Sequence, residues 1–125
     1  MPKKMTAIEA LDIFLRQALK PRRSERYCDL IQRPKGQKRF LADLYHTLGG
    51  CFRAELSDTE LTDEQIASPG FSYSVRRGFG VVETSIEEGF NSLMPDTGWL
   101  LVAADGTFGI YQPEDRIDDR RQIVA

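Results

Sequence analysis

The segment WLLVAADGTFGIY, residues 99–111, decides the fold that we predict for this chain. Its first six residues are apolar, a length and composition typical of a fully buried strand. The dipeptide Asp105-Gly106 is the strongest hairpin signal in the sequence, because both residues suit the positive φ angles of a tight turn. Residues 107–111 would then return as the partner strand. The segment therefore predicts an antiparallel β-hairpin in the C-terminal half.

A second hairpin is predicted upstream, over residues 71–83. Residues 71–75 alternate between bulky apolar side chains and serine, the period of a strand with one buried face. Arg76-Arg77-Gly78 predicts the turn into a second strand at residues 79–83. Between the hairpins, Ser85 and Glu88 have capping-box spacing and predict a short helix that Pro95 and Gly98 would end. Residues 122–125 are a candidate edge strand.

Helical patterns occupy the N-terminal half. Thr6 and Glu9 form a capping-box pattern, and apolar residues recur at helical spacing from there to Pro21. An apolar stripe predicts a further helix over residues 37–48, with Gly49-Gly50 as its C-terminal stop.

Two shorter helices are also expected. Ser24 would cap one that carries Tyr27, Leu30 and Ile31, and that Pro34 and Gly36 would close. The other spans residues 63–67, after candidate caps at residues 57, 59 and 62, and ends at Pro69-Gly70.

Helices first and strands afterwards predict an α+β fold, with the helical N-terminal half packed on one face of a small antiparallel sheet from the C-terminal half. The 125 residues suit a single domain over residues 1–125. A composition of 41% hydrophobic and 29% charged residues is typical of folded proteins. The order of elements and the lack of GxGxxG and GxxxxGK(S/T) strings argue against a parallel nucleotide-binding sheet.

The charges are sorted along the chain. Residues 1–40 hold eleven Lys/Arg and four Asp/Glu, whereas residues 41–125 hold six Lys/Arg and fifteen Asp/Glu. The formal net charge of −2 therefore hides a basic and an acidic half. Such asymmetry bears on partners and association rather than on the fold.

The basic stretch at residues 20–39 is the principal candidate site. Clustered arginine and lysine side chains can steer an acidic protein partner, bind nucleic-acid phosphates, or form a solvated face that the acidic half neutralises. The candidate partner- or nucleic-acid-binding residues are Arg22, Arg23, Arg26, Arg33, Lys35, Lys38, Arg39, Arg76 and Arg77. The acidic residues 55–64 are an alternative steering face, with exposed aromatic side chains as expected anchors.

Residues 77–84, RGFGVVET, resemble the RNP1 octamer of RNA-recognition motifs, K/R-G-F/Y-G/A-F-V-x-F/Y, at the first four positions and the sixth. Residues 40–44 loosely resemble the companion RNP2 strand. The resemblance implies RNA binding, with Phe40 and Phe79 as base-stacking residues. The sequence departs from the octamer at Val81 and Thr84, where the family has aromatic residues, and we assign no family on this match.

Catalysis is a third possibility. His46 is the only histidine, with Asp43 one helical turn before it, and Cys28 or Cys51 would be the nucleophile if the fold brought one close. The histidine is more typical of a helix-end charge, and the cysteines of small core residues. No zinc-ligand or EF-hand spacing occurs, so we predict neither a metal site nor a cofactor.

We therefore expect a small cytoplasmic binding module, namely a protein adaptor, regulator or inhibitor, rather than an enzyme. Nucleic-acid binding through residues 20–39 and the RGFG hairpin is the alternative, and self-association of the oppositely charged halves is a further option. No stretch of about 20 apolar residues occurs, so no membrane partner is expected.

Overall fold

The computed structural model describes residues 5–45, 47–53, 61–93, 96–113 and 121–124. The helices are α1 (Ala7–Ala18), α2 (Pro21–Leu30), α3 (Pro34–Asp43), the 3-10 helix η1 (Thr47–Cys51), α4 (Asp63–Ala67) and α5 (Ile86–Leu93). The strands are β1 (Gly70–Ser74), β2 (Gly78–Glu83), β3 (Trp99–Ala103), β4 (Phe108–Gln112) and β5 (Arg121–Val124). The predicted α+β fold is confirmed.

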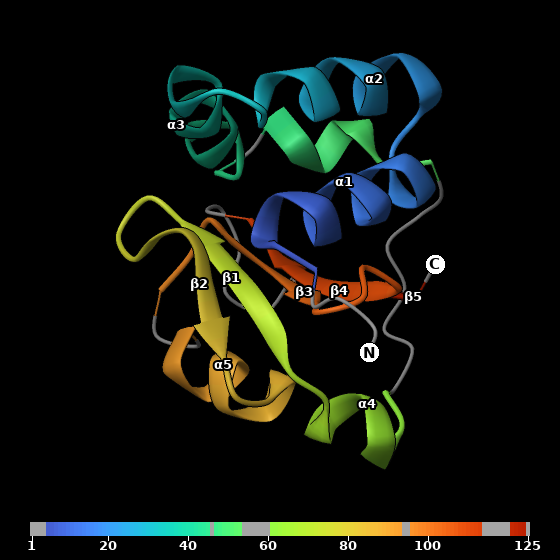
Figure 1. The fold of residues 1–125 in the computed structure, drawn as a ribbon, viewed down its shortest axis with the longest axis vertical. Coiled ribbons are helices and arrows are strands. Elements are labelled where there is room, and N and C mark those ends of the chain that lie inside the picture. The colour runs from blue at the N-terminus through green and yellow to red at the C-terminus, as the bar shows by residue number, and fades with distance from the viewer. Residues whose placement is uncertain (1–4, 46, 54–60, 94–95, 114–120, 125) are drawn as a thin grey trace.

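The five strands form one antiparallel sheet in the order β2-β1-β3-β4-β5. Helices α1 and α3 contact one face of this sheet, α2 lies beyond α1, and α5 lies on the opposite side of the sheet (Figure 1). The sequence predicted the first helical layer. It did not predict that α5 would cover the other face.

Alternation along the strands separates two apolar cores. Tyr73, Leu100 and Val102 pack with the N-terminal helices, whereas Trp99 and Leu101 pack with α5. Side chains on successive residues of a strand point to opposite faces, so a strand buried on both faces is apolar throughout. This explains the uninterrupted apolar run of β3, whose five residues are all buried.

The start of α1 and the positions of both hairpins agree with the sequence, but β1 is buried on both faces, whereas the alternation in residues 71–75 predicted one buried face. Thr6 and Glu9 make both hydrogen bonds of the capping box. The turn between β3 and β4 contains Asp105-Gly106, but only Gly106 has the expected positive φ, at +78, and Asp105 does not. Between β1 and β2, Gly80 is an extra residue at φ +75 that produces a β-bulge, because Ser72 pairs with Val81 while Tyr73 pairs with Phe79.

Two predictions about the ends of α2 are wrong. Ser24 does not cap α2, because the helix begins at Pro21, and Lys20 is its N-cap. Pro34 and Gly36 do not close α2 but lie in the first turn of α3. Proline suits the first helical position, where no intrahelical partner for an N–H is lost. Gly36 allows close contact, since a Cβ at this position would lie 1.8 Å from the carbonyl oxygen of Leu30.

The helix predicted over residues 37–48 is shorter and begins earlier. It ends at Asp43, and Gly49-Gly50 lie inside η1 instead of stopping an α-helix. The hydroxyl of Tyr111 on β4 donates a hydrogen bond to the carbonyl oxygen of Leu44, at 2.6 Å. This contact satisfies a backbone acceptor at the end of α3, where intrahelical partners run out.

The remaining short elements follow the sequence. Thr62 caps α4, and Gln65 completes the capping box. The capping box predicted at the start of α5 is half formed: Ser85 Oγ accepts a hydrogen bond from the backbone N–H of Glu88, but the Glu88 carboxylate accepts one from the hydroxyl of Thr84. The C-terminal strand β5 is an edge strand that pairs with β4.

Candidate partner-binding surface

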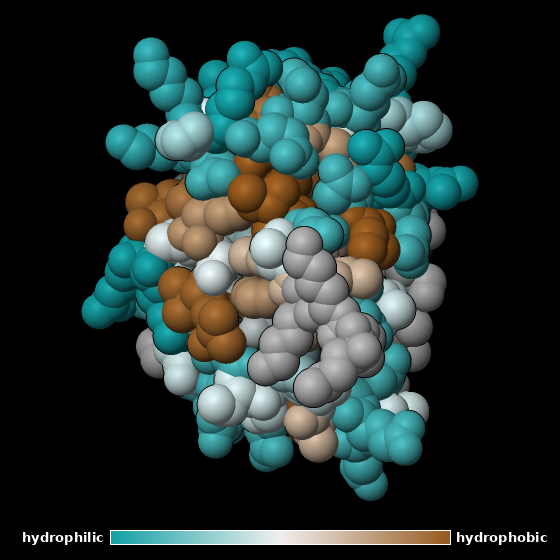
Figure 2. Space-filling model, viewed as in Figure 1, coloured by the Kyte–Doolittle hydropathy of each residue, from teal (hydrophilic) through white to brown (hydrophobic). Residues whose placement is uncertain are grey.

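Helices α2 and α3 carry most of the predicted cations on their outer sides. We name the following set the α2–α3 basic surface: Arg22, Arg23, Arg26, Arg33, Lys35, Lys38 and Arg39. All seven residues are exposed. The two helices lie at one end of the molecule, where most projecting atoms are hydrophilic (Figures 1 and 2).

The residues that the structure describes neutralise few of these cations. Arg33 pairs with Asp29 at 3.2 Å, and Arg39 pairs with Asp43 at 3.3 Å. Within the described part of the chain, Arg22, Arg23, Arg26, Lys35 and Lys38 form no ion pair. Residues 20–43 contain eight Lys/Arg and three Asp/Glu. The surface therefore retains a net positive charge.

The acids of α4 and α5 lie away from this surface. These helices carry Asp63, Glu64, Glu87 and Glu88 and no Lys or Arg. They lie at the end of the molecule opposite to α2 and α3 (Figure 1). Of the acidic face expected over residues 55–64, residues 55–60 lie outside the described residues. The charge asymmetry of the sequence is thus partly an asymmetry in space.

The N-termini of α2 and α3 add to the positive potential of this surface. Neither α2 nor α3 has an acidic residue in its first turn or a side-chain cap. Arg22 and Arg23 follow Pro21, and Lys35 follows Pro34. Cations near a helix N-terminus are unfavourable because the helix dipole places partial positive charge there. The first turns of both helices therefore combine backbone and side-chain charge of the same sign.

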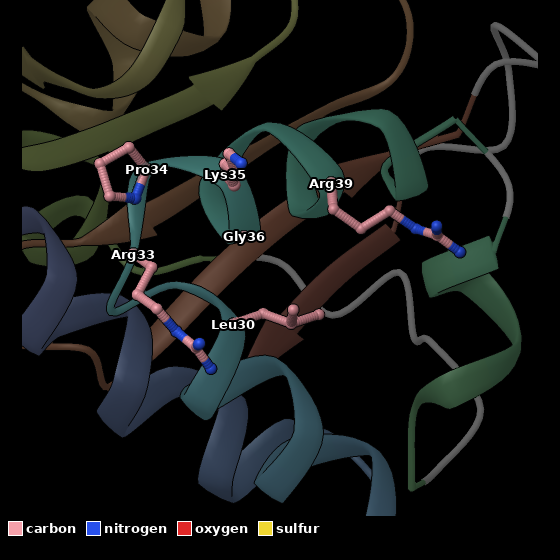
Figure 3. Close-up of a pocket in the computed structure, with 6 residues that line it drawn as sticks. All are labelled: Leu30, Arg33, Pro34, Lys35, Gly36 and Arg39. Atoms are coloured by element: carbon pink, nitrogen blue, oxygen red, sulfur yellow. The ribbon is translucent and has the colours of Figure 1, made fainter.

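A pocket of about 610 Å³ opens at the corner between α2 and α3. It is lined by Leu30, Arg33, Pro34, Lys35, Gly36 and Arg39 (Figure 3). In this view Leu30 lies between Arg33 and Arg39, with their guanidinium groups on opposite sides of it. We call this site the corner pocket. The sequence predicts Leu30 within a short helix and Pro34 at the end of that helix, so neither is among the predicted site residues.

Arg39 is oriented by a buried interaction between the two helices. The hydroxyl of Tyr27 donates a hydrogen bond to Oδ2 of Asp43, at 2.7 Å, and Arg39 Nε donates to Oδ1 of the same carboxylate. Only 13% of the Asp43 side chain is exposed. Burial, together with the hydrogen bond to Asp43, raises the pKa of Tyr27, so the phenol stays protonated as a donor. Asp43 therefore positions one guanidinium of the corner pocket.

Arg76 and Arg77 of the β1–β2 turn have acidic partners in the C-terminal half. Arg76 pairs with Asp96 at 2.7 Å, and Arg77 Nη1 lies 3.1 Å from Glu83 Oε1. The latter contact lacks hydrogen-bond geometry at Nη1, so it is an attraction between opposite charges. Ser72 Oγ donates a hydrogen bond of 2.9 Å to Glu83. These two arginines are neutralised locally, unlike most of the α2–α3 basic surface.

The two aromatic residues implied by the RNP1 resemblance pack with the N-terminal core, Phe40 as a buried residue and Phe79 as a partly buried one. Phe40 lies on α3 rather than on a strand and is fully buried. Phe79 packs edge-to-face against Tyr73 and Phe40, with ring centroids 5.0 and 6.2 Å away. They do not form an exposed stacking pair. Across the described residues no aromatic side chain is exposed, so the expected aromatic anchors are absent from this part of the chain.

Each candidate catalytic residue that the structure describes has its own local partners. His46 lies outside the described residues, and Asp43 is engaged by Tyr27 and Arg39. Both thiols are buried: Cys28 donates to the carbonyl oxygen of Asp12, and Cys51 to that of Thr47. Burial, reinforced by the carboxylate of Asp12, raises the pKa of Cys28 to about 11. At neutral pH this thiol is therefore protonated and a poor nucleophile.

The described residues bring together no group of three or more histidine, cysteine, aspartate or glutamate side chains that could hold a metal ion. The helices of the described part are all too short or too polar to cross a membrane. No family model, curated protein or solved structure matches the chain.

Proposed function

We propose that the chain is a protein-binding module that recognises an acidic surface of its partner through the α2–α3 basic surface. The observation that carries this proposal is the group of exposed cations on two neighbouring helices, five of which form no ion pair with a described residue. Complementary charge steers the encounter of two proteins and fixes their relative orientation. The exposed cations of this surface stay hydrated until the partner binds, which suits them to steering the encounter.

The composition of the surface supports a protein partner over a nucleic acid. Leu30 and Pro34 add apolar area that a phosphate backbone would not use. Single-stranded nucleic acid is commonly bound by stacking on exposed aromatic rings, which the described residues do not supply.

The test compares three labelled polyanions by fluorescence anisotropy: a glutamate-rich peptide, a single-stranded RNA and a duplex DNA. Each is titrated with the purified protein at about 50 mM and about 150 mM salt, which bracket a Debye length of roughly 10 Å. We expect saturable binding of the peptide at both salt concentrations. Tighter binding of either nucleic acid, or no binding of any probe at the lower salt, would overturn the proposal.

Charge-reversal variants locate the binding surface. We expect Arg26→Glu to slow association with the acidic peptide and raise its Kd, because the charge lies on the α2–α3 basic surface. The matched control is Arg53→Glu, an equal charge change at an exposed residue outside that surface. Equal effects of both variants would show that net charge alone, rather than this surface, governs binding.

Nucleic-acid binding is a second candidate that one observation favours. Helices α2 and α3 have ten residues each and are separated by residues 31–33. Lys35, Lys38 and Arg39 share an exposed face of α3 at helical spacing. Helix-turn-helix proteins join two helices by a similarly short turn and place the second in the major groove of DNA. A steep loss of DNA affinity with salt, together with tighter binding of DNA than of the peptide, would favour this candidate.

Self-association is a special case of the proposed function. The acidic residues of α4 and α5 on a second copy would present the required negative surface. Light scattering coupled to size exclusion, at low and at high salt, tests it. A monomer at both salt concentrations would direct the search to a different protein.

A further inference from the structure

The corner pocket combines apolar and cationic groups within a small space. Leu30 is half-buried at the end of α2, and exposed Pro34 stands at the start of α3. Arg33 and Arg39 extend on either side of Leu30, and Lys35 projects from the first turn of α3 (Figure 3). The pocket therefore offers an apolar floor with positive charge around it.

The two guanidinium groups keep most of their hydrogen-bonding capacity. Arg33 uses Nη2 toward Asp29, and Arg39 uses Nε toward Asp43. An arginine has five N–H donors, and the described residues use no other donor of either side chain, so these donors can bind a carboxylate. Their side chains are 71% and 62% exposed, respectively. Asp43 holds Arg39 in place without closing its outer edge to a ligand.

We propose that the corner pocket is the specificity-determining anchor of the module and takes a leucine-sized apolar side chain flanked by carboxylates, presented by an acidic segment of the partner protein. This inference rests on the proposed function. The apolar side chain packs on Leu30 and Pro34, while the neighbouring carboxylates contact Arg33 and Arg39. Charge alone would bind any acidic segment, whereas the floor of the pocket selects those that carry the apolar residue.

The apolar floor is what distinguishes this ligand from a bare anion. A phosphate or an isolated carboxylate could pair with the arginines but would gain nothing from Leu30. Covering apolar surface removes it from water and contributes favourable free energy in proportion to the area. Because the pocket is open, a ligand covers only part of its floor. We therefore expect a preference of about fivefold to tenfold rather than the full effect of burying a leucine.

Two labelled peptides test the anchor: one has a single leucine in the middle of a glutamate-rich sequence, and the other has serine at that position. The measurement is the ratio of their Kd values, obtained by fluorescence anisotropy with the wild-type protein. We expect the leucine peptide to bind about fivefold to tenfold more tightly. Equal affinity of the two peptides would overturn this inference and leave the proposed function intact. Failure of both peptides to bind would overturn the proposed function as well.

The Leu30→Ser variant assigns the preference to the corner pocket. We expect the ratio to fall to about one, because the apolar floor is lost while the arginines remain. The control is Val82→Ser, which removes an apolar side chain that is 74% exposed on β2 and should leave the ratio unchanged. A ratio that persists in Leu30→Ser would place the apolar contact elsewhere and overturn the inference.

A measurement on the wild-type protein covers the case in which Leu30→Ser does not fold. The methyl resonances of Leu30 are followed by NMR while each peptide is added. We expect saturable shifts of these methyl signals with the leucine peptide, and much smaller ones with the serine peptide. Unchanged Leu30 signals at saturation would overturn the inference.

Discussion

The hydroxyl of Tyr27 donates a hydrogen bond to Oδ2 of Asp43 at 2.7 Å, which joins the middle of α2 to the last residue of α3. Tyr27 is buried, and its ring packs edge-to-face on Phe40 with centroids 5.7 Å apart. The bond therefore links the orientation of the two helices to the position of Arg39, the second partner of Asp43. The basic surface depends on this internal contact for part of its geometry.

Removing that hydroxyl should destabilise the protein. We expect Tyr27→Phe to lower the free energy of unfolding by about 1–3 kcal/mol, because a largely buried carboxylate loses a donor. Urea unfolding measures the change. Tyr45→Phe is the control, since the hydroxyl of Tyr45 makes no hydrogen bond with the described residues. Similar stabilities of the two variants would contradict a structural role for the Tyr27 bond.

The contact between α3 and α2 predicts a large effect at Gly36. We expect Gly36→Ala to cost about 3 kcal/mol or more, because its Cβ would lie 1.8 Å from the carbonyl oxygen of Leu30 and would force the helices apart. Gly50→Ala is the matched substitution, since a Cβ there meets no other atom within 4 Å. Thermal and urea unfolding of both variants test this difference. A Gly36→Ala variant as stable as Gly50→Ala would show that the helix ends are not so close.

The two arginines of the β1–β2 turn should differ in their contribution to stability. Glu83 is 7% exposed and has Arg77 and Ser72 as partners, so Arg77→Met would leave a buried carboxylate without its counter-charge. We expect a loss of about 1–3 kcal/mol, reduced from the value for a fully buried pair because Arg77 is partly exposed. Arg76→Met should cost within about 0.5 kcal/mol, since Arg76 is highly exposed. Equal losses in denaturant unfolding would refute this distinction.

Alkaline pH should lower stability through Cys28. Its folded-state pKa is raised from 9.0 to about 11, so between these values the unfolded chain releases a proton that the folded chain retains. Stability from this source is complete below about pH 9 and falls progressively as the pH approaches 11. Tm measured from pH 8 to pH 11 should fall less steeply in Cys28→Ala than in the wild type. Parallel curves would argue against a buried, protonated thiol.

The local signals in the sequence predicted the fold class because they agree with tertiary packing. The capping box at Thr6, the cap at Thr62 and the hairpin turn at Asp105-Gly106 are short-range features, and the structure contains each of them. Proline was misleading because it can either end a helix or begin one. Pro34 begins α3, and this depends on the fit between Gly36 and Leu30 that only the tertiary structure shows.

The candidate surface was only partly predictable for the same reason. A run of cations is visible in sequence, but their pairing depends on which acids the fold brings close. Arg76 and Arg77 resembled the other candidates and proved to have local acidic partners. Leu30 has the spacing of a core residue, yet the short connection to α3 leaves it partly open in the corner pocket. No pattern in the sequence predicts that a residue such as Leu30 is partly exposed.

Cations on α2 and α3 and acids on α4 and α5 separate positive from negative charge along the molecule, which gives it an electric dipole. Near a negatively charged surface, such a molecule experiences a torque that turns α2 and α3 forward before any atom touches. More collisions then occur in the orientation that allows binding, so productive collisions make up a larger fraction of all collisions. Salt shortens the distance over which this alignment operates to about 8 Å at physiological ionic strength.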